Sequence, residues 1–207
     1  MGSLDLEQLV RQLTAPERPH ARMLVGVDGP GASGKSTLAE LIRERLTGAV
    51  VVHVDDFFLP SAVRDSRAGL TGELFDLPRL EREVLVPVST GAGCAYRRYD
   101  WDSDTLAEDL AVPAGVPVIV EGVYSLSRRL RAYYSYKIYC RASHDLRLER
   151  GVERDGEAMR AVWTDEWMPQ ETRYEASEDP VAGTDLVVDS SRPGSGSDVF
   201  DVVYAGS

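Results

Sequence analysis

The stretch DGPGASGKST, which begins at residue 28, constrains the fold of this chain more than any other feature. It matches the phosphate-binding pattern Gly-x-x-x-x-Gly-Lys-Ser/Thr at Gly29, Gly34, Lys35 and Ser36. An apolar run over residues 23–27 precedes it, and apolar residues recur at helical spacing over 38–46. The stretch therefore predicts a loop that joins a buried strand to a helix.

The residue types of this loop suit the binding of a phosphate chain. Glycines let backbone N–H groups point at a phosphate, and the helix that follows adds the partial positive charge of its N-terminus. Lys35 is expected to reach the outer phosphates, and the Ser36 hydroxyl to ligate Mg²⁺. The expected nucleotide-binding residues of the loop are Gly29, Gly31, Ala32, Ser33, Gly34, Lys35, Ser36 and Thr37. The alternative is a glycine-rich turn that binds nothing.

Composition limits the partners and the location of such a chain. Its 207 residues suit one compact domain with a sheet covered on both faces. The formal net charge of −11 disfavours nucleic acid and anionic membranes as partners, and no apolar run is longer than a strand. Cys94 and Cys140 have no paired spacing, so neither a disulfide framework nor a zinc site is predicted, and the expected location is cytoplasmic. The sequence leaves homo-oligomer formation open.

The apolar pattern predicts an α/β fold. Five strands are expected within residues 23–28, 49–54, 116–123, 136–140 and 185–189. The run of β-branched residues over 49–54, without polar alternation, is typical of a parallel sheet with both faces covered. The chain is expected to consist of an N-terminal helix within 1–19, a phosphate-loop domain over 20–189 and a C-terminal extension over 190–207, in which 190–198 form a flexible link.

Two of the predicted strands end in acidic residues. Asp55 and Asp56 follow the strand of 49–54, and Glu121 ends the strand within 116–123. Since ligands of an open α/β sheet bind beyond the carboxyl ends of its strands, these carboxylates are expected to face the same crevice as the loop. Asp55 would accept a proton from a substrate hydroxyl or hold the water shell of a metal ion, and Glu121 would coordinate Mg²⁺ or orient the nucleophile. Helix caps and ordinary ion pairs are the alternatives.

Two further groups of residues are candidates for substrate contact. Residues 95–101 alternate in polarity and carry aromatic side chains, which predicts a strand or hairpin arm that lines a pocket or packs on its own surface. Arg147, Arg150 and Arg154 are three and four residues apart, so they lie on one face of a predicted helix. Their guanidiniums would clamp a triphosphate, unless ion pairs with neighbouring Glu and Asp residues occupy them.

Together these stretches resemble the uridine kinase and phosphoribulokinase family of phosphate-loop kinases. The resemblance covers about residues 22–189 and rests on the phosphate loop, Asp55-Asp-Phe-Phe58, Tyr99-Asp-Trp101, Val120-Glu-Gly122 and Arg147-x-x-Arg150-x-x-x-Arg154-Asp155, in this family's order. It implies a three-layer P-loop NTPase fold with a five-stranded parallel sheet between helices. A small substrate-binding hairpin and an arginine-bearing lid over the phosphates are also implied.

The resemblance implies roles for individual residues. The catalytic residues would be Lys35, Asp55 and Glu121, with Asp55 as the general base on the acceptor hydroxyl. The metal site would be formed by Ser36, Asp55 and Glu121. Arg150 and Arg154 would bind phosphate from the lid. The acceptor would contact Asp55, Phe58, Asp76, Tyr99 and Arg147, with Asp76 at the sugar hydroxyls and Tyr99 beside the base.

The activity implied by the resemblance is transfer of the γ-phosphoryl group of ATP, with Mg²⁺, to a hydroxyl of a small nucleoside-like acceptor. The chain departs from uridine kinases in two places. They carry a histidine a few residues after the tyrosine, where this chain has Trp101-Asp-Ser-Asp104, and they have a second lid arginine where this chain has Gly151. The block DDFFLP over 55–60 also looks like that of nicotinamide riboside kinases, so another hydroxylated acceptor stays open. The rival from another class is a nucleotide-dependent switch without an acceptor, and a nucleic-acid-processing NTPase is disfavoured by the acidic charge.

Overall fold

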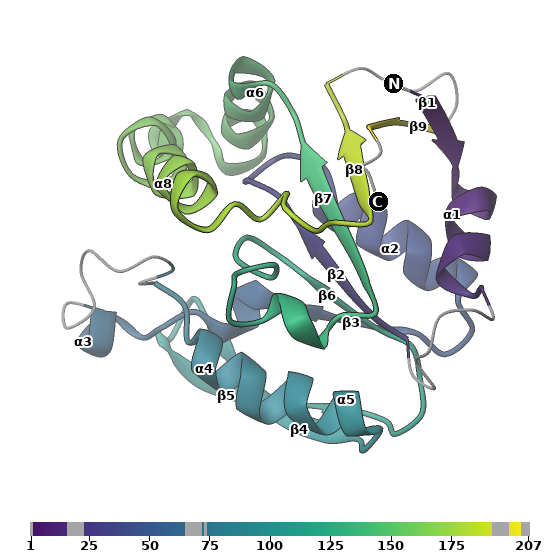
Figure 1. Ribbon diagram of the computed structural model, residues 1–207. Coiled ribbons are helices and arrows are strands. Elements are labelled where there is room, and N and C mark those ends of the chain that lie inside the picture. The colour runs from purple at the N-terminus through teal and green to yellow at the C-terminus, as the bar shows by residue number, and fades with distance from the viewer. Residues whose placement is uncertain (1, 16–22, 65–71, 73, 192–198, 204–207) are drawn as a thin grey trace.

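The computed structural model describes residues 2–15, 23–64, 72, 74–191 and 199–203. Within them a seven-stranded sheet forms the centre of the molecule, in the order β1-β9-β8-β7-β2-β6-β3 (Figure 1). Its strands are β1 (Gly2–Asp5), β2 (Leu24–Asp28), β3 (Val50–His53), β6 (Val118–Glu121), β7 (Tyr136–Arg141), β8 (Leu186–Asp189) and β9 (Val199–Val203). The expected hairpin is present as β4 (Cys94–Asp100) and β5 (Thr105–Val112), which pair separately from this sheet.

The strands β8, β7, β2, β6 and β3 are parallel to one another, so the predicted five-stranded parallel sheet is confirmed. Successive side chains of a strand point to opposite faces of the sheet. Val118 and Val120 accordingly belong to one core cluster and Ile119 to the other. Helices α1 (Leu6–Leu13) and α2 (Lys35–Arg45) cover the Ile119 face, and the helical segment 77–90 covers the opposite face (Figure 1). The molecule therefore has the expected three layers.

Both ends of the chain add strands to one edge of the parallel sheet. β9 pairs antiparallel with β8, and β1 pairs antiparallel with β9. The helix expected within residues 1–19 begins only at Leu6, because residues 2–5 join the sheet and Asp5 caps the helix by accepting the Gln8 N–H at 2.6 Å. Residues 16–19 and 192–198, which include most of the expected flexible link, lie outside the described residues.

Two helical segments each contain a π-helical turn ahead of a proline. The first consists of α4 (Leu77–Leu80), the π turn Glu81–Leu85 and α5 (Val86–Thr90), and the second of α7 (Arg160–Val162), the π turn Trp163–Trp167 and α8 (Met168–Glu178). Pro87 and Pro169 follow these turns. A proline lacks the N–H, and its ring collides with the carbonyl four residues earlier, so the wider turn relieves that collision. Both segments continue past their prolines without a break.

The remaining elements lie around the two ends of the sheet. They are α3 (Ser61–Arg64), α6 (His144–Asp155) and short 3₁₀ turns at Val54–Phe57, Arg131–Tyr133 and Glu157–Met159. α6 and α8 lie together beyond the carboxyl ends of β7 and β8, whereas the hairpin lies with α4 and α5 (Figure 1). None of the helices in the described part of the chain combines the length and the apolar composition that crossing a bilayer requires.

Candidate active site

The phosphate loop joins β2 to α2 and has the backbone that its glycines predict. Gly29 has a φ of +146° and Gly34 a φ of +85°, values that residues with side chains rarely adopt. A Cβ on Gly29 would lie 2.2 Å from the carbonyl oxygen of Cys140, so only glycine fits there. Ala32 has a φ of 59°, and non-glycine residues in this region cluster at binding sites. Gly34 directly precedes α2, so the positive end of the helix dipole points into the loop.

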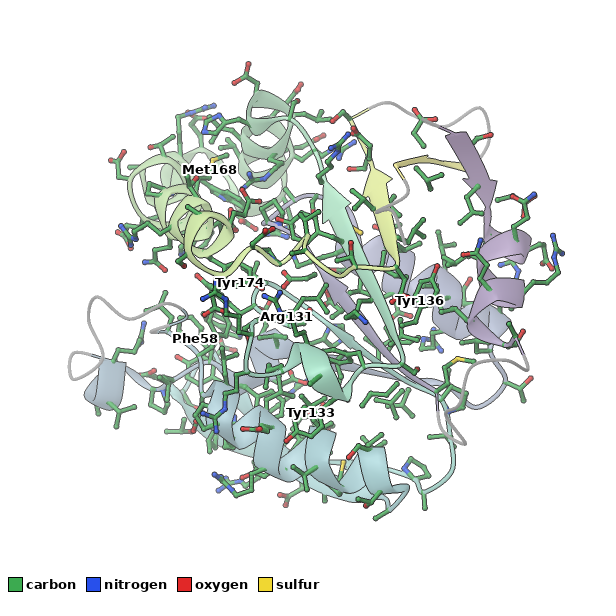
Figure 2. All side chains as sticks on the ribbon, viewed as in Figure 1. Phe58, Arg131, Tyr133, Tyr136, Met168 and Tyr174 are labelled. Carbon is green, nitrogen blue, oxygen red and sulfur yellow. The ribbon has the colours of Figure 1, made fainter. Side chains whose placement is uncertain are left out.

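Asp28, the last residue of β2, is fully buried and joins the loop to two other segments. Its Oδ1 accepts the Gly29 N–H at 2.6 Å. Its Oδ2 accepts the Leu126 N–H at 2.7 Å and the hydroxyl of Tyr174, on α8, at 2.5 Å (Figure 2). Burial raises the pKa of Asp28 to about 6, although these hydrogen bonds and the Lys35 ammonium oppose the rise. Sequence reasoning did not single out Asp28, and the available signal was a charged residue at the end of an apolar strand.

Ser36 and Glu121 form an oxygen-rich pair at the start of α2. The Ser36 hydroxyl donates to Glu121 Oε2 at 3.1 Å, and Oε1 of this carboxylate lies 2.6 Å from His53 Nδ1. The three meet because Glu121 is in register with both Val27 and His53. Burial opposes the ionisation of Glu121, but the His53 hydrogen bond and the Lys35 charge bring its pKa below the usual value. Hydroxyl and carboxylate oxygens are ligands that Mg²⁺ prefers, so the pair is chemically suited to the predicted metal site.

Asp55 lies in the 3₁₀ turn that follows β3. Its carboxylate is open to solvent, yet enough protein surrounds it that lost hydration raises its pKa; the Glu121 charge adds to the rise, and Lys35 opposes it. The charges of Lys35 and Glu121 both act on Asp55, and all three residues lie at the carboxyl ends of neighbouring parallel strands. A raised pKa suits a group that has to accept a proton. His53, which the sequence pattern did not mark as functional, has a side chain that is 43% exposed and bound to Glu121.

Arg147 of α6 supports the phosphate loop. Its guanidinium is buried, with Nε donating to the Gly31 carbonyl at 2.9 Å and Nη2 donating to Glu171. Glu171, on α8, also accepts the Gly31 N–H at 2.7 Å, so the ion pair holds both polar groups of one loop residue. This placement differs from the expected acceptor contact of Arg147, because its guanidinium is committed to the loop. Sequence reasoning missed Glu171, which lies 140 positions away from Gly31 in the chain.

The other two arginines of α6 differ from each other. Arg150 donates to the hydroxyl and the carbonyl of Ser190 at 3.1 and 3.0 Å, and the Ser190 hydroxyl donates to the Ser33 carbonyl of the loop at 2.8 Å. The side chain of Arg154 is 65% exposed and pairs with the next residue in the chain. Its pKa is raised by that pairing and, in addition, by the charge of Asp55. Arg154 is therefore less committed to contacts with the phosphate loop than Arg147 and Arg150 are.

Gly151 provides the space for a buried tryptophan. A Cβ on Gly151 would lie 2.5 Å from the Trp163 indole, and a Cβ on Gly31 would lie 2.7 Å from it. The indole is 1% exposed, and its Nε1 donates to Asp155 at 3.0 Å. The absence of a side chain at Gly151 thus makes room for an aromatic ring that packs α6 against the phosphate loop.

The expected acceptor residues on the hairpin side form an aromatic group with one carboxylate. The ring centroid of Phe58 (Figure 2) lies 5.3 Å from that of Tyr99 and 4.5 Å from that of Trp101. The Tyr99 hydroxyl donates to Asp104 at 2.6 Å. Hydrogen bonds from Ser61 and Tyr99 lower the pKa of Asp104 to about 2, so its carboxylate is an anion beside the aromatic group.

Asp76 lies at the N-terminus of α4 and is tied to the turn that carries Asp55. Its Oδ1 accepts the Arg79 N–H at 3.2 Å, as a helix cap does, and its own N–H donates to the Phe57 carbonyl at 2.8 Å. A backbone hydrogen bond therefore joins the segment of Asp76 to the turn of Asp55, and these are the two carboxylates expected to contact the acceptor.

A family model gives the first comparison with known proteins. The model described as Phosphoribulokinase / Uridine kinase family matches residues 24–170. Uridine-cytidine kinase B of Dictyostelium discoideum is 30% identical over 141 residues, which are 64% of this chain and 58% of that protein. Inorganic pyrophosphatase TTM2 of Arabidopsis thaliana is 29% identical over 140 residues, 64% of this chain and 20% of that protein. The chain thus spans less than two thirds of the length of either relative.

Solved structures give the second comparison. The structure of a possible uridine kinase from Bacillus stearothermophilus superposes with a TM-score of 0.68 at 20% sequence identity, over 87% of this chain and 95% of that one. At this identity the likeness shows the fold alone, and it shows the same phosphate-loop architecture.

Proposed function

Since the chain belongs to the phosphoribulokinase/uridine kinase family, we propose that it transfers the γ-phosphoryl group of ATP to a hydroxyl of a nucleoside-like small molecule. One observation carries the proposal: Lys35, the Ser36–Glu121 pair and Asp55 converge at the carboxyl ends of three neighbouring parallel strands. This is the edge at which open α/β sheets bind their ligands.

Asp55 is proposed to act as the general base. Its carboxylate accepts the proton of the acceptor hydroxyl while that oxygen forms a bond to the γ-phosphorus, and the bond to the β-phosphate oxygen breaks to release ADP. Its pKa, raised by lost hydration, makes it a better proton acceptor than an ordinary aspartate. Its access to solvent leaves room for an acceptor in the crevice.

Lys35 and the Ser36–Glu121 pair are proposed to handle the phosphates. Lys35 begins α2, so its ammonium reaches the outer phosphates over the positive end of the helix dipole. Ser36 and Glu121 would hold Mg²⁺, Glu121 either directly or through water. The bound ion would neutralise charge on the phosphate chain. Arg154 is proposed to approach the transferring group from α6, because its guanidinium is exposed and the charge of Asp55 raises its pKa.

The acceptor is proposed to be a nucleoside with a flat ring. Phe58, Tyr99 and Trp101 offer aromatic faces for stacking, and the Asp76 carboxylate is suited to sugar hydroxyls. Uridine and cytidine are the first candidates, because a uridine-cytidine kinase is among the relatives. Nicotinamide riboside is the second, because an anionic Asp104 beside aromatic rings favours a cationic ring over a neutral one.

The test is coupled ADP release from MgATP in the presence of uridine, cytidine, nicotinamide riboside or ribulose 5-phosphate, with a control that lacks an acceptor. Stimulation by one nucleoside, lost in Asp55→Asn while ATP still binds, supports the proposal. Stimulation by none of them, together with an ATP-induced conformational change, would favour a nucleotide-dependent switch.

A further inference from the structure

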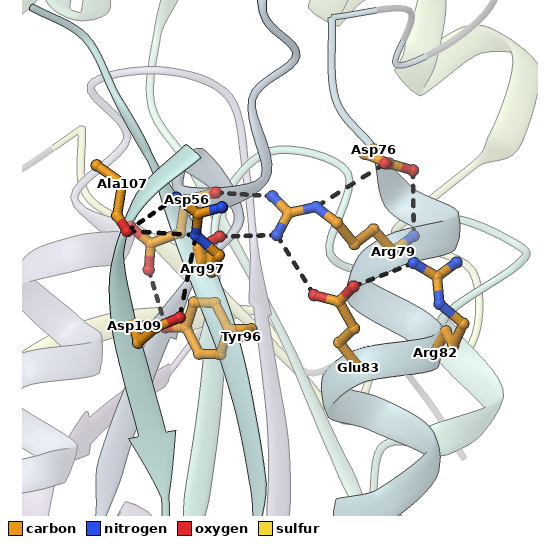
Figure 3. A network of polar contacts seen from close by, with 9 residues as sticks. All are labelled: Asp56, Asp76, Arg79, Arg82, Glu83, Tyr96, Arg97, Ala107 and Asp109. Atoms are coloured by element: carbon orange, nitrogen blue, oxygen red, sulfur yellow. Dashed lines mark hydrogen bonds and ion pairs between the residues drawn. The ribbon is translucent and has the colours of Figure 1, made fainter. Parts of the chain in front are cut away.

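Arg79 of α4 is a buried cation, 6% exposed, that contacts three segments next to the expected acceptor residues. Its Nη2 donates to the Asp56 carbonyl at 3.0 Å, and its Nη1 donates to the Arg97 carbonyl at 2.7 Å (Figure 3). Nη1 also lies 3.4 Å from the Glu83 carboxylate, and Nε lies 3.8 Å from that of Asp76. These groups use all three nitrogens of the guanidinium.

The segments that meet at Arg79 are those that would bind and activate the acceptor. Asp56 directly follows Asp55 in the 3₁₀ turn. Arg97 lies in β4, two residues before Tyr99. One side chain therefore links the turn of the proposed base to the hairpin that carries the aromatic group.

Tyr96 provides a second connection between the same two segments. Its hydroxyl donates to Asp56 Oδ2 at 2.9 Å (Figure 3), and its ring stacks on Phe57 with centroids 5.0 Å apart. The Arg79 guanidinium lies over the same Phe57 ring, 4.3 Å from its centroid. Burial and the Asp56 charge raise the pKa of Tyr96, so its hydroxyl stays protonated and able to donate.

We propose that Arg79 is a positioning residue that sets the distance between the Asp55 turn and the acceptor-binding hairpin. The inference rests on the proposed function, since it assumes that the acceptor lies between these segments. The planar guanidinium suits this task, because it donates in fixed directions to two carbonyls while it also faces two carboxylates. An ammonium keeps the charge but does not present the same fork.

The test compares Arg79→Met and Arg79→Lys with a matched control on the same helical segment, Arg82→Met. The Arg82 side chain is 67% exposed and lies 3.1 Å from the same Glu83 carboxylate, without a contact to either carbonyl that Arg79 binds. Both Arg79 variants are expected to raise the acceptor KM by about 10- to 100-fold, since charge-assisted buried hydrogen bonds are lost, and to leave the KM for ATP unchanged. Arg82→Met is expected to leave both constants unchanged.

A second measurement does not depend on catalysis. Amide hydrogen exchange over residues 94–112 is expected to become faster in both Arg79 variants and in Tyr96→Phe, while exchange in the phosphate loop stays as in the wild type. If Arg79→Met does not fold, Arg79→Lys and Tyr96→Phe carry the test. Wild-type hairpin exchange and wild-type acceptor KM in the folded variants would overturn the proposal. If no acceptor is found, faster hairpin exchange still supports the role of Arg79, and the failure falls on the proposed function alone.

Discussion

The buried carboxylate of Asp28 predicts a specific dependence of stability on pH. Its pKa is raised from 3.8 to about 6 in the folded chain, chiefly by burial. Between these two values the folded chain binds the proton more tightly than the unfolded chain does, so the free energy of unfolding falls as the pH rises. Above the folded pKa the loss is complete. In Asp28→Asn this contribution is absent at every pH.

The size of the effect follows from the two pKa values. Linkage gives a destabilising contribution of about 2 kcal/mol at pH 5 and about 3 kcal/mol at pH 7.5 for pKa values of 3.8 and about 6. Urea unfolding of the wild type and of Asp28→Asn should therefore show a stability difference that changes by about 1 kcal/mol between these pH values, in favour of the variant at the higher pH. Asp28→Asn also loses hydrogen bonds, which changes its free energy of unfolding by the same amount at every pH. The quantity to compare is therefore how the difference between the two proteins changes with pH.

The hydroxyl of Tyr174 offers an independent check of this reasoning. Its hydrogen bond stabilises the ionised form of Asp28, so Tyr174→Phe should raise the pKa of Asp28 and move the pH-dependent loss of stability to higher pH. Parallel pH profiles for the wild type and Asp28→Asn would refute the assignment, because they would show that Asp28 titrates alike in the folded and unfolded chains.

Three further predictions concern the crevice and the lid. Asp55→Asn should lower kcat by about 10²- to 10⁴-fold with unchanged nucleotide affinity in a binding titration; retained turnover would remove Asp55 as the base. Ser36→Ala should raise the Mg²⁺ concentration needed for half-maximal ADP release, and an unchanged Mg²⁺ requirement would separate this hydroxyl from the metal. Gly151→Arg should lower the free energy of unfolding by about 1–3 kcal/mol in urea, because the new side chain collides with Trp163; wild-type stability would show that the indole can leave its slot at little cost.

The parts of the fold that sequence predicted are those determined by local pattern. A few neighbouring residues were enough to predict each of these parts. The loop glycines predicted their backbone conformation, the β-branched run before Asp55 predicted a buried strand, and the acid at the end of β6 predicted its own position. Topology then follows, because parallel strands joined by helices bring their carboxyl ends to one edge. The edge strand β1 was not predicted, since its four residues pair with β9 from the other end of the chain.

The supporting contacts of the site were not predictable in the same way. The partners of Gly31 and Asp28 lie on α8, 140 and 146 positions further along the chain, and a single sequence carries no sign of such pairs. The spacing of Arg147 correctly placed it on the same helix as Arg150, but spacing does not tell which guanidinium turns towards the loop. Glu171 decides which guanidinium turns towards the loop, because its carboxylate neutralises Arg147 in a buried position.

The contacts of α8 with the phosphate loop limit how far α6 and α8 can move away from it. α8 holds Asp28 at the start of the phosphate loop through Tyr174 and holds Gly31 through Glu171. A rigid rotation of α6 and α8 away from the loop would break both contacts and leave the buried Asp28 with one fewer donor, which is costly for an ionised carboxylate.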